Sequence, residues 1–330
     1  MILHNSKKIL VIGGGGYIGT ALVEKLVEMN HLVRVFDLFL YGNNIIDSKN
    51  IEIIKGDIRS KQDIKKIFQD IEVVYHLACI SNDPSFELNP ELSKSINYDS
   101  FKPIVKLAKD SGVKRFIYAS SSSVYGVRNE LEINEELELK PITDYSKYKA
   151  KCEDILLQEA NNYFNVLIAR PATVCGYSKR LRLDLTVNIL TINAINNKNI
   201  KVFGGEQKRP NIHIDDICKF YIDCINKHNN KFNDKIYNVG FENLKILEVA
   251  HMIKNTLSIN IPIIIKKTDD IRSYHISSKK VNKEFGFYPN KQITDAIVEI
   301  NNASINKLII DPLNNSNYYN LSKMKELNLV

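Results

Sequence analysis

The sequence predicts an α/β protein with a parallel sheet covered by helices on both faces, followed by a smaller α/β lobe. Short apolar runs alternate with amphipathic stretches through the first half of the chain, and a glycine-rich segment separates the first run from the first amphipathic stretch. The alternation becomes less regular after Arg170-Pro171. Strands that alternate with helices form βαβ units, which make a parallel sheet with helices on both faces.

Hydrophobic periodicity predicts the individual elements. The strands expected in the first half are Ile9–Ile12, Leu32–Phe36, Ile51–Ile54, Val73–His76, Arg115–Ala119 and Val166–Ala169. The helices expected there are Thr20–Met29, Lys61–Gln69, Pro90–Ser111 and Thr143–Tyr163. Beyond Arg170 we expect a strand at Lys201–Phe203 and helices at Asp184–Asn196, Asp215–Asn226, Leu247–Leu257, Ser277–Phe285 and Thr294–Asn306. The polar, Asn-rich residues from Asp311 onward are expected to form a loose tail.

Composition narrows the function classes. The chain has 330 residues, of which 44% are hydrophobic and 25% charged, with a net charge of +7. The charges are interleaved, which argues against a nucleic-acid-binding patch but suits an anionic substrate. The five cysteines form no C-x-x-C pair, so neither a disulfide framework nor a zinc site is indicated. No apolar run is long enough to span a membrane and no signal peptide precedes the first strand, so a cytoplasmic protein is expected.

The glycine-rich segment indicates a dinucleotide site. Gly13, Gly16 and Gly19 form G-x-x-G-x-x-G between the first strand and the first helix. Such a turn lets the backbone approach a diphosphate and directs the N–H groups of the helix N-terminus at it, although glycines also form ordinary turns. Asp37 ends the next strand and could accept hydrogen bonds from the adenosine ribose. A carboxylate there repels a 2′-phosphate, and Leu38-Phe39-Leu40 supplies no Arg, so NAD is favoured over NADP.

A second carboxylate follows the third predicted strand in Gly56-Asp57-Ile58. Asp57 could bind the adenine amino group of the dinucleotide. A turn-capping Asp is the alternative interpretation of the same residue.

Tyr145 and Lys149 are the candidate catalytic pair. They lie one helical turn apart, so both side chains project from one face. A neighbouring ammonium and the positive nicotinamide ring would stabilise the phenolate, so Tyr145 could act as a base. Y-x-x-x-K alone usually marks a solvated helix face. The hydroxyl-rich run Ser120–Ser123, at the end of a buried strand, strengthens the catalytic interpretation because a hydroxyl there could hold the substrate oxygen.

These motifs together resemble the extended short-chain dehydrogenase/reductases of the nucleotide-sugar epimerase/dehydratase group. The resemblance extends from Lys8 to about Ile300. The motifs that carry it are IGGGGYIG, GDIR at Gly56, HLA at His76, IN at Ile96, SSSSVYG at Ser120, YSKYK at Tyr145, RPATVCG at Arg170 and RPNIHIDD at Arg209. It implies a Rossmann-type, doubly wound parallel sheet with a smaller C-terminal α/β substrate lobe. It also implies an NAD-binding domain at 1–170, to which 211–240 returns, and a nucleotide-sugar lobe at 171–210 and 241–330.

The resemblance assigns roles residue by residue. It makes Ser121 the catalytic hydroxyl, Tyr145 the acid/base, and Lys149 the group that binds the nicotinamide ribose and lowers the Tyr pKa. The residues it implies for NAD binding are Gly13, Gly16, Tyr17, Ile18, Gly19, Asp37, Asp57, Ile58, Ala78, Tyr145 and Lys149. Those implied for the nucleotide sugar are Ser122, Asn188, Arg209 and Arg272, with ordinary surface ion pairs as the alternative for the two arginines. His213 is expected to pack or orient its loop, and no metal is expected.

The sequence departs from the family at Ser122-Ser123, where the 4,6-dehydratases carry Asp-Glu. Serine cannot readily protonate the leaving hydroxyl or remove the C5 proton, so a dehydratase is disfavoured. We therefore expect an NAD-dependent NDP-sugar 4-epimerase that acts through a transient 4-keto sugar. An NDP-sugar dehydrogenase or reductase is the nearest alternative, and a non-catalytic NAD-binding sensor is a remote one. By resemblance alone, the helices Pro90–Ser111 and Thr143–Tyr163 predict a homodimer.

Overall fold

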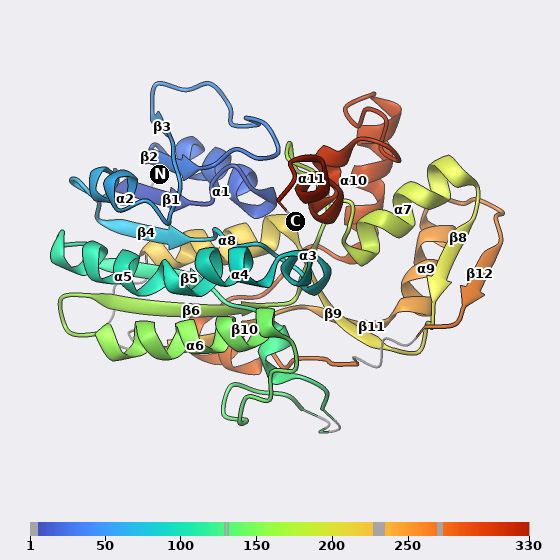
Figure 1. Ribbon diagram of the computed structural model, residues 1–330. Coiled ribbons are helices and arrows are strands. Elements are labelled where there is room, and N and C mark those ends of the chain that lie inside the picture. Colours follow the sequence, from blue (N-terminus) through green and yellow to red (C-terminus); the bar gives the residue numbers. More distant parts are fainter. Residues whose placement is uncertain (1–5, 129, 131, 227–234, 269–272, 330) are drawn as a thin grey trace.

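The computed structural model describes residues 6–128, 130, 132–226, 235–268 and 273–329. Its largest sheet has seven parallel strands in the order β10-β6-β5-β4-β1-β2-β3 (Figure 1). The strands are β1 (Lys8–Ile12), β2 (Leu32–Asp37), β3 (Ile51–Lys55), β4 (Val73–His76), β5 (Arg115–Ala119), β6 (Asn165–Pro171) and β10 (Lys235–Val239). This is the predicted doubly wound fold, in which the strand order reverses between β1 and β4. A ligand crevice is expected at the carboxyl ends of those two strands.

Successive residues of each strand face two separate cores. Ile9 and Val11 of β1 pack into one core with the helices α1 and α8, whereas Leu10 and Ile12 pack into the other with α2, α5 and α6. These helices are α1 (Tyr17–Glu28), α2 (Lys61–Lys66), α5 (Phe101–Asp110), α6 (Asp144–Glu159) and α8 (Ile214–Asn226). Because the central strands β1, β4 and β5 are buried on both faces, their sequences are nearly continuous apolar runs, which is why the sequence reveals them.

The predicted helix Pro90–Ser111 is interrupted. It consists of α4 (Pro90–Lys94), a π-helical turn at Ser95–Asp99, and α5. The wide turn carries Asn97, whose side chain binds both backbone groups of Ile80 after β4, at 2.8 and 2.9 Å. A continuous hydrophobic period does not reveal this long-range hydrogen bonding.

Other differences from the predicted elements are smaller. The helix α3 (Asp83–Leu88) was not expected, and it begins at Asn82, whose side chain accepts from the amide of Ser85. No strand was predicted where β10 pairs with β6, because the mixed KIYNV run has neither clean alternation nor a continuous apolar character. The expected helix Ser277–Phe285 ends in the π-helical turn Val281–Phe285.

A second lobe lies beside the carboxyl ends of the large sheet (Figure 1). It contains a three-stranded sheet, β11-β9-β7, and a two-stranded sheet, β12-β8. Its elements are β7 (Thr173–Cys175), α7 (Thr186–Asn197), β8 (Ile200–Phe203), β9 (Lys208–His213), β11 (Glu242–Lys245), α9 (Ile246–Thr256), β12 (Ile263–Lys266) and α10 (Ile293–Ile305). Side chains such as Val187, Ile253 and Ile297 form a separate apolar core between its helices.

The expectation of a loose tail after Asp311 is wrong. The segment forms a 3₁₀ turn at Ser316–Tyr318 and the helix α11 (Asn320–Glu326). Met324 is buried, and Leu183 donates its amide to the carbonyl of Tyr318 at 2.8 Å. Polar composition hid this order because it comes from specific hydrogen bonds.

None of the helices in the described ranges combines the length and the apolar character that crossing a bilayer requires.

Candidate active site

The glycine loop joins the carboxyl end of β1 to the first turn of α1. Gly13 has a φ of +85°, and a Cβ there would lie 2.4 Å from the amide nitrogen of Ala78. A Cβ on Gly19 would lie 2.4 Å from the carbonyl oxygen of Gly13. Both positions therefore require glycine. Gly16 is the N-cap of α1 and supplies no side-chain cap, so the first-turn N–H groups are left for a ligand.

Asp37 lies beside this loop at the end of β2. Its carboxylate accepts hydrogen bonds from the amides of Gly15, at 2.9 Å, and Phe39, at 2.7 Å. Burial raises the pKa of the Asp37 carboxyl, while the Phe39 and Gly15 amides and the charge of Arg180 act in the opposite direction. Asp37 thus holds the loop in shape, and its hydrogen bonding to a ribose stays a prediction.

Of the other residues predicted to bind the cofactor, Ala78 contacts the glycine loop, whereas Asp57 and Ile58 are not among the residues that line the cavity described below. Asp57 follows β3 and pairs with the guanidinium of Arg59 at 2.5 Å. Burial opposes ionisation of Asp57, but the Arg59 hydrogen bonds prevail and lower its pKa. Ile58 packs into the second core, and Ala78 lies against Gly13. The contacts with Arg59 fit the alternative interpretation of Asp57 as a turn-capping residue. Binding of the adenine amino group by Asp57 stays a prediction.

A cavity of about 330 Å³ opens along the carboxyl ends of the strands. Its lining includes Gly13, Gly16, Tyr17, Ile18 and Gly19 from the loop, and Ser121, Ser122, Tyr145 and Lys149 from the predicted catalytic segments. The fold thus brings the glycine loop and the Tyr/Lys pair to one cavity. Glycines that leave no room for a Cβ, together with a helix start that has no side-chain cap, fit a dinucleotide.

The catalytic candidates come from two elements. Tyr145 and Lys149 lie on α6, which begins with a capping box between Thr143 and Ser146. The Lys149 ammonium is buried, donates to the carbonyl of Ala119 at 2.6 Å and lies 5.9 Å from the centre of the Tyr145 ring. Ser121 follows β5, and its hydroxyl lies 2.8 Å from that of Ser123. The three side chains are therefore presented to the cavity by a strand end and a helix start.

Burial dominates the electrostatics of Tyr145 and raises the pKa of its phenol well above the ordinary value. The nearby Asp83 carboxylate raises it further, whereas the charge of Arg182 and a hydrogen bond from Ser121 lower it. The sequence had pointed only to Lys149 as the cation beside this phenol. The structure adds Arg182, which lines the same cavity and pairs with Asp184 at 2.6 Å.

A buried polar network supports the floor of the cavity. Glu153 of α6 binds Arg170 of β6 at 2.6 Å and accepts a short hydrogen bond from Ser120. Arg170 also donates to the hydroxyl of Tyr125 at 2.7 Å. Because Glu153 and Arg170 are nearly inaccessible to solvent, this pair connects α6 rigidly to β6, and Ser120 connects it to the end of β5.

The predicted substrate residues separate into three groups. Ser122 and Arg209 line the cavity, and the Arg209 guanidinium lies 5.3 Å from the ring centre of Tyr274. Asn188 is fully buried and bonds to the hydroxyl of Tyr17 and to the backbone of Arg182 and Gly176. Arg272 lies outside the described residues.

Sequence reasoning missed several residues at the cavity. Those brought there by the fold include Tyr41, Asn82, Asp83, Arg180, Arg182 and Asn320. Arg180 and Arg182 belong to the segment from Tyr177 to Leu183, in which no motif singles them out. Asn320 had no signal at all, because it belongs to the segment expected to be a loose tail.

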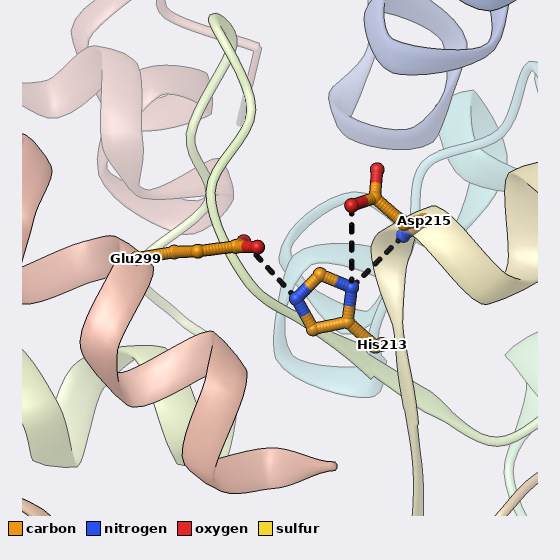
Figure 2. A group of neighbouring side chains, drawn as sticks. All are labelled: His213, Asp215 and Glu299. Carbon is orange, nitrogen blue, oxygen red and sulfur yellow. Dashed lines mark hydrogen bonds and ion pairs between the residues drawn. The ribbon is translucent and has the colours of Figure 1, made fainter. Parts of the chain in front are cut away.

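His213 belongs to a charge network between the lobes (Figure 2). Its Nε2 lies 3.0 Å from Glu299 on α10, and its Nδ1 accepts from the amide of Asp215 at 3.1 Å. Lys291 bridges Asp215 and Glu299 at 2.5 and 2.6 Å. Although burial opposes it, Lys25 and Lys291 bring the pKa of Asp215 to about 2. Lys291 thus pairs with both carboxylates, and the cluster links α8 to α10 through ion pairs.

Comparisons with known proteins agree with this geometry. Residues 9–240 match the model of the NAD dependent epimerase/dehydratase family. A UDP-glucose 4-epimerase from Lactobacillus helveticus is 28% identical over 316 residues, which span 88% of this chain and 94% of that protein.

Solved structures share the fold. The UDP-glucose 4-epimerase of Thermotoga maritima with UDP-glucose has a TM-score of 0.82 at 22% identity, over 91% of this chain and 99% of that one. The dTDP-glucose 4,6-dehydratase DesIV of Streptomyces venezuelae with NAD bound has a TM-score of 0.82 at 20% identity, over 93% and 99%. Since the family match covers more than half of the chain and the glycine loop fits its cofactor, this protein belongs to the NAD-dependent epimerase/dehydratase family and is an enzyme with NAD as its cofactor.

Proposed function

We propose that this enzyme is an NDP-sugar 4-epimerase that acts through a transient 4-keto sugar. The observation that carries the proposal is the convergence of Ser121, Tyr145 and Lys149 with the glycine loop on one cavity. Ser122 and Ser123 stand in that cavity where a 4,6-dehydratase would need an acid and a base, which favours reversible oxidation alone. The whole-length likeness to a UDP-glucose 4-epimerase gives further support.

The residues of the chain would divide the proton chemistry between them. Bound NAD supplies the hydride acceptor and donor for C4 of the sugar. Tyr145 takes the proton from the 4-hydroxyl and later returns it, while Ser121 holds the same oxygen by a hydrogen bond. Because burial raises the pKa of Tyr145, the phenolate needs nearby cations. The charge of Arg182 lowers that pKa, and the Lys149 ammonium lies 5.9 Å from the centre of the phenol ring. In an epimerase the keto sugar turns over in the cavity before reduction on its other face.

The nucleotide diphosphate of the substrate would be held from the second lobe. Arg209 lines the cavity from β9, and an Arg fork suits diphosphate oxygens. We assign NAD binding to residues 1–170 and 211–240, and sugar binding to 171–210 and 241–330. The pairing of β10 with β6 in the large sheet supports this division. A homodimer formed through α5 and α6 is part of the same proposal, and size-exclusion chromatography with light scattering tests it.

A net dehydrogenase or reductase remains the nearest alternative, because it would use the same three residues. The pure protein should be incubated with UDP-, GDP-, dTDP- and CDP-sugars, with the products read by NMR and the absorbance of NADH followed in parallel. Epimerisation at C4 without accumulation of NADH is the expected result. NADH that accumulates in step with product would identify a dehydrogenase instead, and an inert panel with intact NAD binding would favour a non-catalytic sensor.

A further inference from the structure

One segment of the second lobe reaches back to the glycine-loop helix. The Ser178 hydroxyl lies 2.8 Å from the hydroxyl of Thr20 and donates to the carbonyl of Tyr17 at 3.0 Å. The adjacent Lys179 pairs with Glu24 at 3.1 Å. The buried Ser178 contacts fix the segment on α1, the helix whose N-terminus faces the cavity, whereas the Lys179 pair is exposed and contributes little.

Arg180, the next residue, is a buried cation in the cavity wall. It is only 4% exposed, and its guanidinium lies 3.8 Å from the centre of the Tyr41 ring. One terminal nitrogen donates to the side chain of Asn320 at 2.6 Å, whereas Nε has no hydrogen-bond partner among the described residues. Burial lowers the pKa of Arg180 to about 10, so the group is still charged at neutral pH. Burying a charged group whose N–H donor has no hydrogen-bond partner costs free energy. A bound anion that accepts from this N–H would offset that cost.

The position of Arg180 indicates which anion this is. Arg180 lines the same cavity as the glycine loop, next to Tyr41 and within the electrostatic reach of Asp37. NAD carries its negative charge on the diphosphate alone. A 2′-phosphate would meet the carboxylate of Asp37, and the substrate diphosphate already has Arg209 as a candidate partner.

We propose that Arg180 binds the diphosphate of NAD from the second lobe, opposite the glycine loop, and that Asn320 positions it. The diphosphate would then be held between helix N–H groups on one side and a guanidinium on the other. This inference concerns retention of NAD and does not depend on which sugar is the substrate.

Asn320 connects the C-terminal segment to this contact. Its side-chain amide donates to the hydroxyl of Ser81 at 2.9 Å, and its backbone amide donates to Asp184 at 3.2 Å. A single residue of α11 therefore joins the loop after β4 to the loop that carries Arg180. By fixing the guanidinium, it makes the C-terminal helix part of the cofactor site.

The test is calorimetric titration of the full-length Arg180→Gln variant with NAD, ADP-ribose, NADP and UDP. Loss of one charge-assisted hydrogen bond should weaken NAD and ADP-ribose by about tenfold or more and leave UDP unchanged. Unchanged affinity for NAD would overturn the proposal. So would a selective loss of UDP affinity, which would assign Arg180 to the substrate diphosphate, or a loss confined to NADP, which would assign it to a 2′-phosphate.

Matched variants separate binding from charge and folding. Lys179→Gln removes one positive charge from the neighbouring, half-exposed side chain and should leave NAD affinity unchanged. Asn320→Ala keeps the Arg180 guanidinium but removes the side chain that holds it in position. NAD affinity should therefore fall by about threefold, a smaller effect than in Arg180→Gln. If Arg180→Gln failed to fold, Asn320→Ala and the conservative Arg180→Lys would decide: full NAD affinity in both would overturn the proposal.

Discussion

The two walls of the cavity are built on different principles. The wall formed by the large sheet presents backbone: glycines that exclude a Cβ, and a helix start without a side-chain cap. The lining contributed by the second lobe presents long charged side chains such as Arg180, Arg182 and Arg209. Arg180 is held by Asn320, and Arg182 is held by Asp184. The first wall is rigid and tolerates almost no substitution. In the second, single side chains can be replaced one at a time. This difference suits a family whose substrates vary while the cofactor stays the same.

The largest effect should come from the phenol between the walls. Tyr145→Phe removes the proposed acid/base and should lower kcat by about 10²–10⁴-fold, while NAD binding persists. Tyr148→Phe on the same helix is the matched control, because Tyr148 packs against Phe86 and Tyr98. Steady-state kinetics and NAD titration of both variants measure this. Full turnover in Tyr145→Phe would refute the mechanism.

A substitution in the glycine loop should disrupt the part of the cavity that is formed by backbone. Gly13→Ala forces a side chain into a positive-φ position and against the Ala78 backbone. We expect it to abolish NAD binding and to lower the free energy of unfolding by about 2 kcal/mol or more. Gly112 has a φ of +79° with open space around it, so Gly112→Ala tests strain without the clash. Denaturant unfolding and NAD titration should show a loss of about 1 kcal/mol and unchanged NAD affinity for that control.

A charge change in the other wall should shift the pH dependence. The Arg182 charge lowers the pKa of Tyr145, so Arg182→Gln should raise that pKa. Because the base is active only when deprotonated, the acidic limb of the kcat/KM profile should move to higher pH. Lys147→Gln alters an exposed ammonium on the same helix and should leave the profile in place. A profile that moved equally in both variants would exclude a specific role for Arg182.

The smallest effect concerns the helix start that presents Tyr145. The side chain of Thr143 caps α6 by accepting from the amide of Ser146 at 3.3 Å. Thr143→Ala should lower the free energy of unfolding by about 1 kcal/mol and leave NAD affinity unchanged. Thr143→Ser keeps the cap and should restore the stability. Chemical denaturation measures both, and equal stability of the Ala variant and the parent would show that the cap contributes nothing.

The sequence predicted the first half of the fold closely, and the reason is local. The limits of β4 and β5 match their apolar runs, because strands buried on both faces leave a continuous signal. The break in Pro90–Ser111 and the strand β10 were missed, since each depends on a distant partner. The same contrast applies to the cavity. Ser121, Tyr145 and Lys149 stand in motifs, whereas Arg180 and Asn320 become neighbours only through the packing of α11.

By itself, the sequence determined the glycine loop, the acid at the end of the second strand and the one-turn spacing of Tyr145 and Lys149. These features follow from backbone geometry and helical periodicity over a few residues, so a short segment contains them completely. Only the tertiary structure decided which cations line the cavity beside the phenol, and that Asn320 of the polar C-terminal segment lines it too. Those contacts join residues far apart in the chain, and a buried charge depends on the partners that folding brings to it.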